Sequence, residues 1–217
     1  VYDLENVRCT RELAACLASL KNYHVIVIDN DKINRGYAAG NNLGAKRAKS
    51  DYLLILNPDT IVSPGAVESL VAFLDIHPKV GIVAPLLLNL SGQPYPLQGT
   101  RELTPLTGLF ALSFLNRIPN LISNHYWLKD WDKQNPRQVD VVPGTAFLIR
   151  RSLFNQIGGF DEHFFLFFEE SDLCRRVRQA GWAIYMYPPA KIMHHWGAST
   201  PKSSAIQAIF RASRFYY

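Results

Sequence analysis

The chain has 217 residues, of which 48% are apolar, and its 23 basic and 18 acidic side chains leave a net charge of +5. This length suits one α/β domain, and the apolar fraction excludes a largely disordered chain. No run of about 18 uncharged apolar residues occurs, so no membrane-spanning helix is predicted. The mild basic excess is compatible with ordinary solubility, an anionic small ligand or a lipid surface. Its short, separated basic clusters argue against nucleic acid as a partner.

The first half of the chain alternates between helix and strand patterns. Residues 11–20 and 63–78 have the apolar spacing of amphipathic helices, and Ser63 is expected to cap the second, with Pro64 at its first position. The runs "HVIVIDN" (24–30), "DYLLILNPDT" (51–60) and "VGIVAPLLL" (80–88) predict buried strands, the second of them central and covered on both faces. A glycine-spaced stretch, "NRGYAAGNNLGAKRAKS" (34–50), enters a helix. This alternation predicts a mostly parallel sheet.

The second half follows a loop-rich stretch, residues 89–138. "VDVVPGTAFLIRR" (139–151) predicts a strand with a turn at Pro143-Gly144, and a short helix then ends at Gly158-Gly159. A helix is predicted over 169–181 and a strand over 182–188. The chain is therefore interpreted as a single domain, residues 1–217, with halves 1–100 and 101–217.

Acidic residues stand where two predicted strands end. Asp29 follows one strand and Asp59 the next, within Asn57-Pro58-Asp59. Ligands of open parallel sheets bind outside the carboxyl ends of the strands, and a carboxylate there can hold Mg²⁺ or Mn²⁺ against a diphosphate. Asn-Pro-Asp is equally a common start for a turn or a helix cap. These residues alone leave both readings open.

The block "FDEHFFLFFEESDLCRR" (160–176) places acids beside phenylalanines. Glu169 and Glu170 fall at a predicted helix N-terminus, where the helix dipole favours negative charge. An aromatic wall would instead raise the proton affinity of a carboxylate. An acid beside an apolar pocket is a candidate general base. Ordinary acidic capping over a Phe-rich core is the structural alternative.

Two adjacent histidines, His194 and His195, end the segment "KIMHH". Neighbouring residues of a strand point to opposite faces, so at most one is expected to face a given site. The three cysteines, Cys9, Cys16 and Cys174, fit no zinc spacing and predict free thiols in a reducing cytoplasm.

Taken in order, these stretches resemble the family 2 nucleotide-sugar glycosyltransferases, inverting enzymes of the α/β GT-A (Rossmann-like) fold with helices on both sheet faces. The bacterial rhamnosyltransferase-like branch is the nearest in appearance. The stretches that carry the resemblance are "VIVIDN", "NRGYAAGNN", "YLLILNPDTIVSPGAV", "GTAFLIRRSLFNQIGGFDEHFFLFFEESDLCRRVRQAGW" and "HHWGAS". Together they cover about residues 11–100 and 139–200, and their order is more specific than any one of them.

The resemblance implies that residues 1–100 bind a nucleotide-sugar donor and residues 101–217 face a glycan or lipid-linked glycan acceptor. Glu170 would be the catalytic base, with Glu169 and Asp172 as rivals. Asp59 and His194, or less readily His195, would hold Mg²⁺ or Mn²⁺. The donor-binding residues would be Asp29, Asn34, Gly36, Asn41 and Asn57. Cell-surface polysaccharide or glycan assembly in the cytoplasm is implied, with peripheral contact at the inner face of the membrane left open.

The sequence departs from the family where only "DKI" separates Asn30 from Asn34. A crossover between parallel strands needs about a dozen residues. A non-catalytic nucleotide- or glycan-binding relative is therefore the alternative. A dinucleotide-binding oxidoreductase is disfavoured because no G-x-G-x-x-G follows the first strand.

Overall fold

A computed structural model describes residues 2–3, 11–28, 33–118, 120–195 and 203–217. Asp29 and Cys9 lie outside the described residues. The helices are α1 (Arg11–Ser19), α2 (Gly36–Arg47), α3 (Ala66–Ile76), α4 (Pro105–Ala111), η1 (Phe114–Arg117, a 3₁₀ helix), α5 (Leu121–Tyr126), α6 (Arg151–Gln156), α7 (Glu169–Gln179) and α8 (Ser204–Tyr216). The strands are β1 (Tyr2–Asp3), β2 (Val25–Ile26), β3 (Tyr52–Leu56), β4 (Thr60–Val62), β5 (Val80–Leu88), β6 (Arg137–Val139), β7 (Ala146–Arg150) and β8 (Ala183–His194).

The main sheet has the order β3-β7-β5-β8-β4, and β6 pairs with β8 beside this path. β5 and β8 are parallel, as are β1 and β2 in a separate small sheet. The pairings β3–β7, β5–β7, β4–β8 and β6–β8 are antiparallel. The predicted parallel sheet is thus confirmed only in part, because strands from the second half of the sequence insert between strands of the first.

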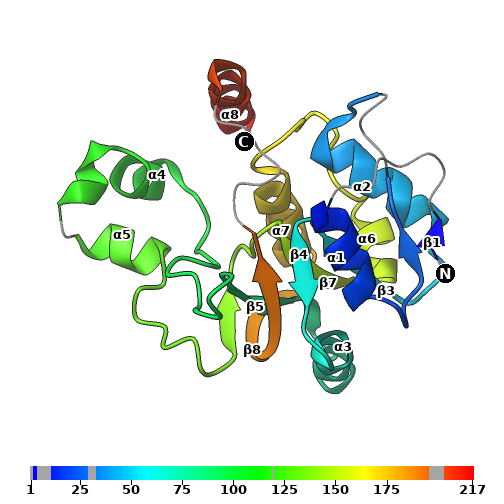
Figure 1. Ribbon diagram of the computed structural model, residues 1–217. Helices are drawn as coiled ribbons and strands as arrows, with labels where there is room; N and C mark the ends of the chain where they lie inside the picture. Colours follow the sequence, from blue (N-terminus) through cyan, green and yellow to red (C-terminus); the bar gives the residue numbers. More distant parts are fainter. Residues whose placement is uncertain (1, 4–10, 29–32, 119, 196–202) are drawn as a thin grey trace.

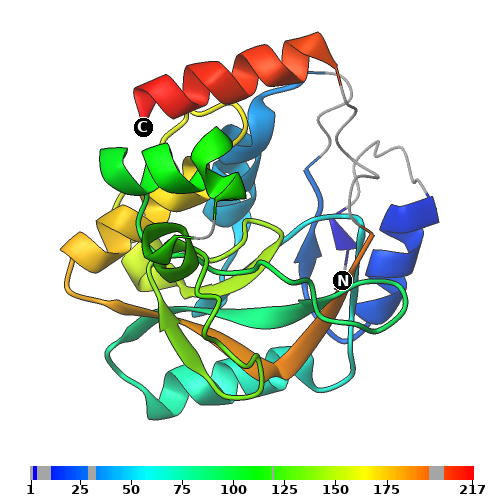
Figure 2. The same cartoon turned by 90° about the vertical axis from the view of Figure 1, so that its left-hand side faces the viewer.

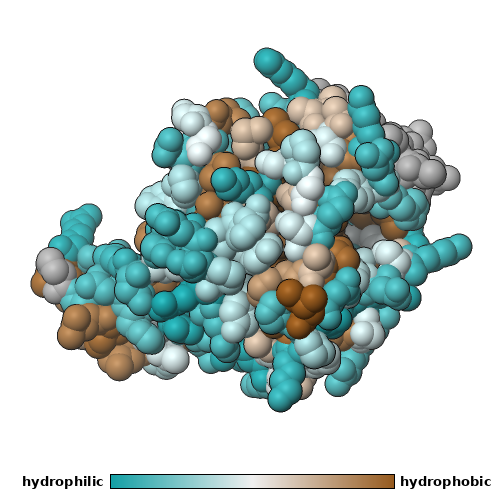
Figure 3. Space-filling view, turned by 90° about the horizontal axis from the view of Figure 1, so that it is seen from below, coloured by the Kyte–Doolittle hydropathy of each residue, from teal (hydrophilic) through white to brown (hydrophobic). Residues whose placement is uncertain are grey.

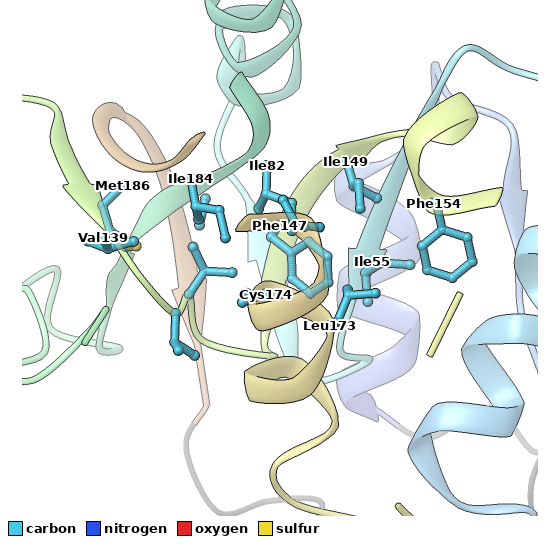
Figure 4. Packing of buried hydrophobic residues seen from close by; sticks show 14 of the residues in the cluster. Ile55, Ile82, Val139, Phe147, Ile149, Phe154, Leu173, Cys174, Ile184 and Met186 are labelled. Atoms are coloured by element: carbon cyan, nitrogen blue, oxygen red, sulfur yellow. The ribbon is translucent and has the colours of Figure 1, made fainter. Parts of the chain in front are cut away.

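Helices cover both faces of this sheet, as predicted (Figure 1). On one face α2, α6 and α7 pack through Ala38, Phe154 and Leu173 onto Phe147 and Ile82. Figure 4 shows Leu173 and Cys174 of α7 lying against these sheet residues. On the other face α1 and α3 form a second core cluster. Apolar contact of this kind on both faces is what holds a layered α/β domain together.

The strand over residues 52–56 is not the central strand that its apolar run predicts. β3 stands at the end of the sheet order and, among the described strands, pairs only with β7. Leu53 and Ile55 are buried, whereas Leu54 and Leu56 are only half-buried. β7 holds the covered position instead, with Phe147 and Ile149 fully buried. A short apolar run does not distinguish a central strand from an outer one, because neither position is encoded locally.

The other predicted helices and strands are present, but the stretch 89–138, predicted as loop-rich, contains α4, η1, α5 and the start of β6, and two further details differ. α3 begins at Ala66, after Gly65 with φ of +77°, so Pro64 precedes the helix rather than opening it. The side chain of Ser63 does not cap this helix. The strand predicted over 24–30 is confirmed as parallel, but β2 spans two residues and is half-buried. Among the described helices, none is both long and apolar enough to cross a bilayer.

Candidate active site

Asp59 lies in the tight connection between β3 and β4. The Thr60 hydroxyl donates to the carbonyl of Asn57 at 2.7 Å, and the Cys16 sulfur lies 3.6 Å from that hydroxyl. The backbone N–H of Asn57 donates to the carbonyl of Thr145 at 2.9 Å. The turn is therefore held by its own side chain, by α1 and by the loop before β7. Asp59 is 4% exposed, so the surrounding protein atoms fix the position of its carboxylate.

His194 is brought to Asp59 by the pairing of β4 with β8, which sets Thr60 opposite His194. Nε2 of His194 lies 3.4 Å from Oδ1 of Asp59, and both side chains are buried. The backbone N–H of His195 donates to the carbonyl of Asp59 at 2.9 Å, while the His195 side chain is exposed. The alternation of faces along the strand thus selects His194 as the histidine beside Asp59, the one favoured on the resemblance.

The donor set of this pair suits a divalent cation. A carboxylate oxygen and an imidazole nitrogen are both ligands of divalent first-row transition metals, the group to which Mn²⁺ belongs. Within the described part of the chain, no group of three or more His, Cys, Asp and Glu side chains could hold a metal. Two protein ligands fit a cation whose remaining positions are filled by phosphate oxygens and water, which is how Mg²⁺ commonly binds with nucleotides.

A second acidic cluster begins α7. Glu169 is 4% exposed, and burial, followed by the charge of Glu170, raises its pKa to about 8. Within the described residues its Oε2 atom has no hydrogen-bond partner. Glu170 is half-buried, and burial raises its pKa although the backbone N–H groups of Glu170 and Ser171 oppose the shift. Two adjoining carboxyls in an apolar setting therefore favour holding a proton.

The turn into α7 is strained and braced from outside. Phe167 and Phe168 have φ of +70° and +68°, a region that bulky residues rarely adopt. Such a conformation costs on the order of 1–3 kcal/mol and persists only where surrounding contacts hold it. Phe168 packs on Phe210 of α8 and stacks on Tyr217, with ring centroids 5.3 Å and 5.6 Å away. Strain of this kind is common at functional sites and fixes the direction of Glu169 and Glu170.

Tyr37 joins the acidic cluster to the loop before β7. Its hydroxyl donates to the carbonyl of Gly144, and its pKa is raised well above the usual value by burial and then by Glu169 and Glu170. A Cβ atom on Gly144 would lie 3.6 Å from the Tyr37 oxygen and 3.7 Å from Cδ of Glu170. Sequence reasoning missed Tyr37, although it is the aromatic residue directly after Gly36 in the quoted glycine stretch.

One loop therefore touches both clusters. Gly144 faces Glu170 and Tyr37, and the next residue, Thr145, accepts from Asn57 in the Asp59 turn. Tyr95, also missed, adds a second support by donating its hydroxyl to the carbonyl of His194 at 2.9 Å. Tyr95 lies between two prolines outside any periodic pattern, so no local signal pointed to it.

Asp172, the third acid of α7, forms an ion pair instead. Its Oδ2 atom accepts from Nε and Nη2 of Arg176 at 2.8 Å and 2.6 Å. Arg176 also donates to the carbonyls of Ile157 and Gly159. Asp172 thus orients an arginine that ties α7 to the end of α6, which weakens its standing as a rival base.

The glycine stretch builds the start of α2 against the segment before Glu169. Gly36 has φ of +81°, and a Cβ there would lie 2.3 Å from the carbonyl oxygen of Phe165. The Asn34 side chain accepts from the backbone N–H of Gly36 at 3.0 Å, and Asn41 donates to the carbonyl of Tyr37 at 2.9 Å. These contacts account for Asn34, Gly36 and Asn41 by folding alone, and donor binding by these three residues and by Asn57 stays a prediction.

The family profile described as glycosyl transferase family 2 matches residues 8–158. The chain belongs to this family. It is 31% identical over 163 residues to the N-acetylglucosaminyl-diphospho-decaprenol L-rhamnosyltransferase of Mycobacterium tuberculosis (strain CDC 1551 / Oshkosh), an alignment covering 71% of this chain and 50% of that protein. It is 24% identical over 167 residues to rhamnosyltransferase WbbL of Escherichia coli (strain K12), covering 74% and 61%. The predicted rhamnosyltransferase-like branch is thereby confirmed.

A solved structure shares the fold. GalNAc-T7 with UDP, GalNAc and Mn²⁺ superposes with a TM-score of 0.54 at 20% identity, over 82% of this chain and 34% of that one. The predicted GT-A-like architecture is confirmed on this basis. This chain spans only half of the length of the mycobacterial relative.

Proposed function

We propose that this family 2 member transfers a sugar from a nucleotide-sugar donor to a glycan or lipid-linked glycan hydroxyl, with inversion and with a divalent metal, in glycan assembly. The observation that carries the proposal is the pairing of two unlike clusters around one loop: Asp59 with His194, and Glu169 with Glu170. The names of the two rhamnosyltransferase relatives support sugar transfer, and Mn²⁺ in the GalNAc-T7 structure supports the metal.

In this proposal Asp59 and His194 hold the cation, which when bound screens the charge on the leaving diphosphate. Asp29, Asn34, Gly36, Asn41 and Asn57 contact the donor. Residues 1–100 form most of the donor side and residues 101–217 most of the acceptor side. The buried free thiols of Cys16 and Cys174 fit the cytoplasmic location expected from the composition.

Glu170 is the proposed base. It takes the proton of the acceptor hydroxyl as that oxygen attacks the anomeric carbon, and the bond from that carbon to the diphosphate oxygen breaks on the opposite face. The raised proton affinity of Glu170 suits this step, since a base works best when its pKa approaches the working pH. Glu169 is buried beside it, where the charge of Glu170 helps to raise the Glu169 pKa, and the Tyr37 hydroxyl donates to the carbonyl of Gly144 in the facing loop.

The experiment is a titration of nucleotide-sugar donors with and without Mn²⁺, coupled to a turnover assay on wild type and Glu170→Gln. We expect Glu170→Gln to bind donor with Mn²⁺ like wild type while turnover falls about 10²–10⁴-fold, the usual contribution of a general base. Asp172→Asn, an acid of the same helical turn tied to Arg176, is the matched control and should keep turnover near wild type.

Donor binding without turnover in wild type, across a broad panel of nucleotide sugars and acceptors, would instead establish the non-catalytic relative. Equal turnover of Glu170→Gln and wild type would remove Glu170 from the mechanism and leave Glu169 as the base to test.

A further inference from the structure

Between β5 and β6 the chain forms a protruding arm, defined here as residues 103–129. It contains α4, η1 and α5, and α4 packs against η1 and α5. Figure 1 shows these elements standing off one side of the sheet, and in Figure 2 they face the viewer. The arm contains none of the four residues Asp59, His194, Glu169 and Glu170, and the proposed chemistry does not account for it.

Large apolar side chains of the arm point to solvent. Leu121 is 85% exposed, Phe114 73%, Ile118 60%, Leu106 56% and Leu109 51%. Figure 3 shows apolar atoms gathered at the outer end of the arm. A concentration of exposed apolar residues within so short a stretch marks an interaction surface rather than ordinary surface scatter.

The charge of the arm has one sign. Residues 103–129 contain no aspartate or glutamate, although the whole chain has 18 acidic residues. Arg117 and Lys129 are exposed, and Arg117 stands directly before Ile118. Exposed apolar side chains interleaved with basic ones, and no acids, are the composition of segments that lie in the interface of anionic membranes.

The exposure results from a well-formed arm, not from a failure to fold. Thr104 and Thr107 form a reciprocal capping box at α4, and the side chains of Ser113 and Asn120 cap η1 and α5. Leu128 and Trp131 anchor the base of the arm in the core. The arm therefore presents its apolar side chains in a fixed direction.

The arm is also tied to the helix that carries Glu170. Glu102, at its base, lies 2.7 Å from Nε of Arg175 and 2.8 Å from Nη2 of Arg178, both on α7. Burial acts to raise the pKa of Glu102, but Arg178 and Arg175 outweigh it and hold that pKa below the usual value. Ionic contacts thus join the base of the arm to α7, the helix that carries the proposed base.

The geometry points to an anionic lipid bilayer as the occupant of this surface, with Leu106, Leu109, Phe114, Ile118 and Leu121 entering the interface and Arg117 and Lys129 meeting lipid phosphates. This deepens the proposed function, because it names the surface at which a lipid-linked acceptor would be met. Only the biological purpose of the membrane contact rests on the proposed function. Binding to lipid is measured separately from turnover, so either proposal can fail while the other stands.

The test is flotation of the whole chain with vesicles of phosphatidylcholine alone and with vesicles that also contain phosphatidylglycerol. We expect wild type to float with the anionic vesicles and not with the neutral ones. The double variant Ile118→Glu/Leu121→Glu should reduce partitioning at least tenfold, and Arg117→Gln about fivefold, the effect of one basic residue at an anionic surface. Circular dichroism checks that the substitutions at these exposed positions leave the fold intact.

Ile76→Glu is the matched control, because Ile76 is 74% exposed but lies at the end of α3, beneath the sheet. It should partition like wild type, and all variants should retain Mn²⁺-dependent donor binding. Equal flotation of the double variant and wild type would overturn the proposal. So would concentration-dependent dimerisation that the double variant abolishes, without vesicle binding, since the arm would then be covered by a second copy.

Discussion

Asp59 and Glu169 are both buried carboxyls at the end of a secondary-structure element, yet their neighbours differ. Asp59 faces the imidazole nitrogen of His194 at 3.4 Å, a partner that can share a cation with it. Glu169 faces Glu170 beside a strained aromatic turn, and burial, followed by the charge of Glu170, raises its pKa to about 8. When environments separate two acidic sites in this way, one suits charge binding and the other proton transfer. The proposed assignment of metal site and base thus rests on the neighbours of each acid rather than on residue type.

Apart from Glu170→Gln, the largest effect should come from Asp59→Asn. If Asp59 holds the cation, turnover should fall on the order of 10³-fold, which corresponds to a loss of several kcal/mol of charge stabilisation. Donor binding should no longer depend on Mn²⁺, in contrast to Glu170→Gln. The measurement is donor affinity at increasing Mn²⁺. A Mn²⁺ response equal to that of wild type would break the comparison, because Asp59 would then be a turn residue only.

Glu169→Gln should change the pH dependence of stability. The folded-state pKa of about 8 lies above the ordinary 4.5, so the folded protein keeps the proton longer, and stability present below pH 4.5 is lost as pH rises to about 8. Glutamine does not titrate, so in this window the loss of unfolding free energy with rising pH should be smaller in the variant, by about 1 kcal/mol per pH unit. Urea unfolding between pH 5 and 8 measures it. Exposed Asp51→Asn is the control, and an unchanged slope in Glu169→Gln would place the carboxyl in water.

Tyr37→Phe tests the loop that joins the two regions. The variant removes the hydroxyl that donates to Gly144 and leaves that carbonyl without this partner. We expect unfolding free energy to fall by about 1 kcal/mol, the usual value for such a bond. Turnover should fall more than Mn²⁺-dependent donor binding, because the loop faces Glu170. A loss of donor binding with turnover preserved at saturation would assign Tyr37 to the donor side instead.

The smallest effect should come from Asp172→Asn. Its ion pair with Arg176 is partly exposed, with side chains 19% and 25% accessible, so its removal should cost about 0.5–1 kcal/mol of stability. Thermal unfolding measures this cost, and turnover should stay within a few-fold of wild type. A rate loss as large as that of Glu170→Gln would make Asp172 the base.

Much of the fold was predictable because its signals are local. The spacing of Leu173 and Val177 predicted the buried stripe of α7, and both are fully buried. The two-residue period of a strand predicted that only one of His194 and His195 would face inward. The ordered family motifs placed Asp59 and His194 in one site, and the structure brings them together.

The sequence by itself therefore indicated most of the helices and strands outside residues 89–138, which acids stand at their ends, and the family to which the chain belongs. Only the tertiary structure decided that β7 lies between β3 and β5, that Asp59 meets His194 through the β4–β8 register, and that Tyr37 and Gly144 flank Glu170. The physical reason is that strand order, register and the burial of a charge depend on contacts between segments far apart in the chain. Hydrophobic periodicity reports only a residue's nearest neighbours along its own helix or strand.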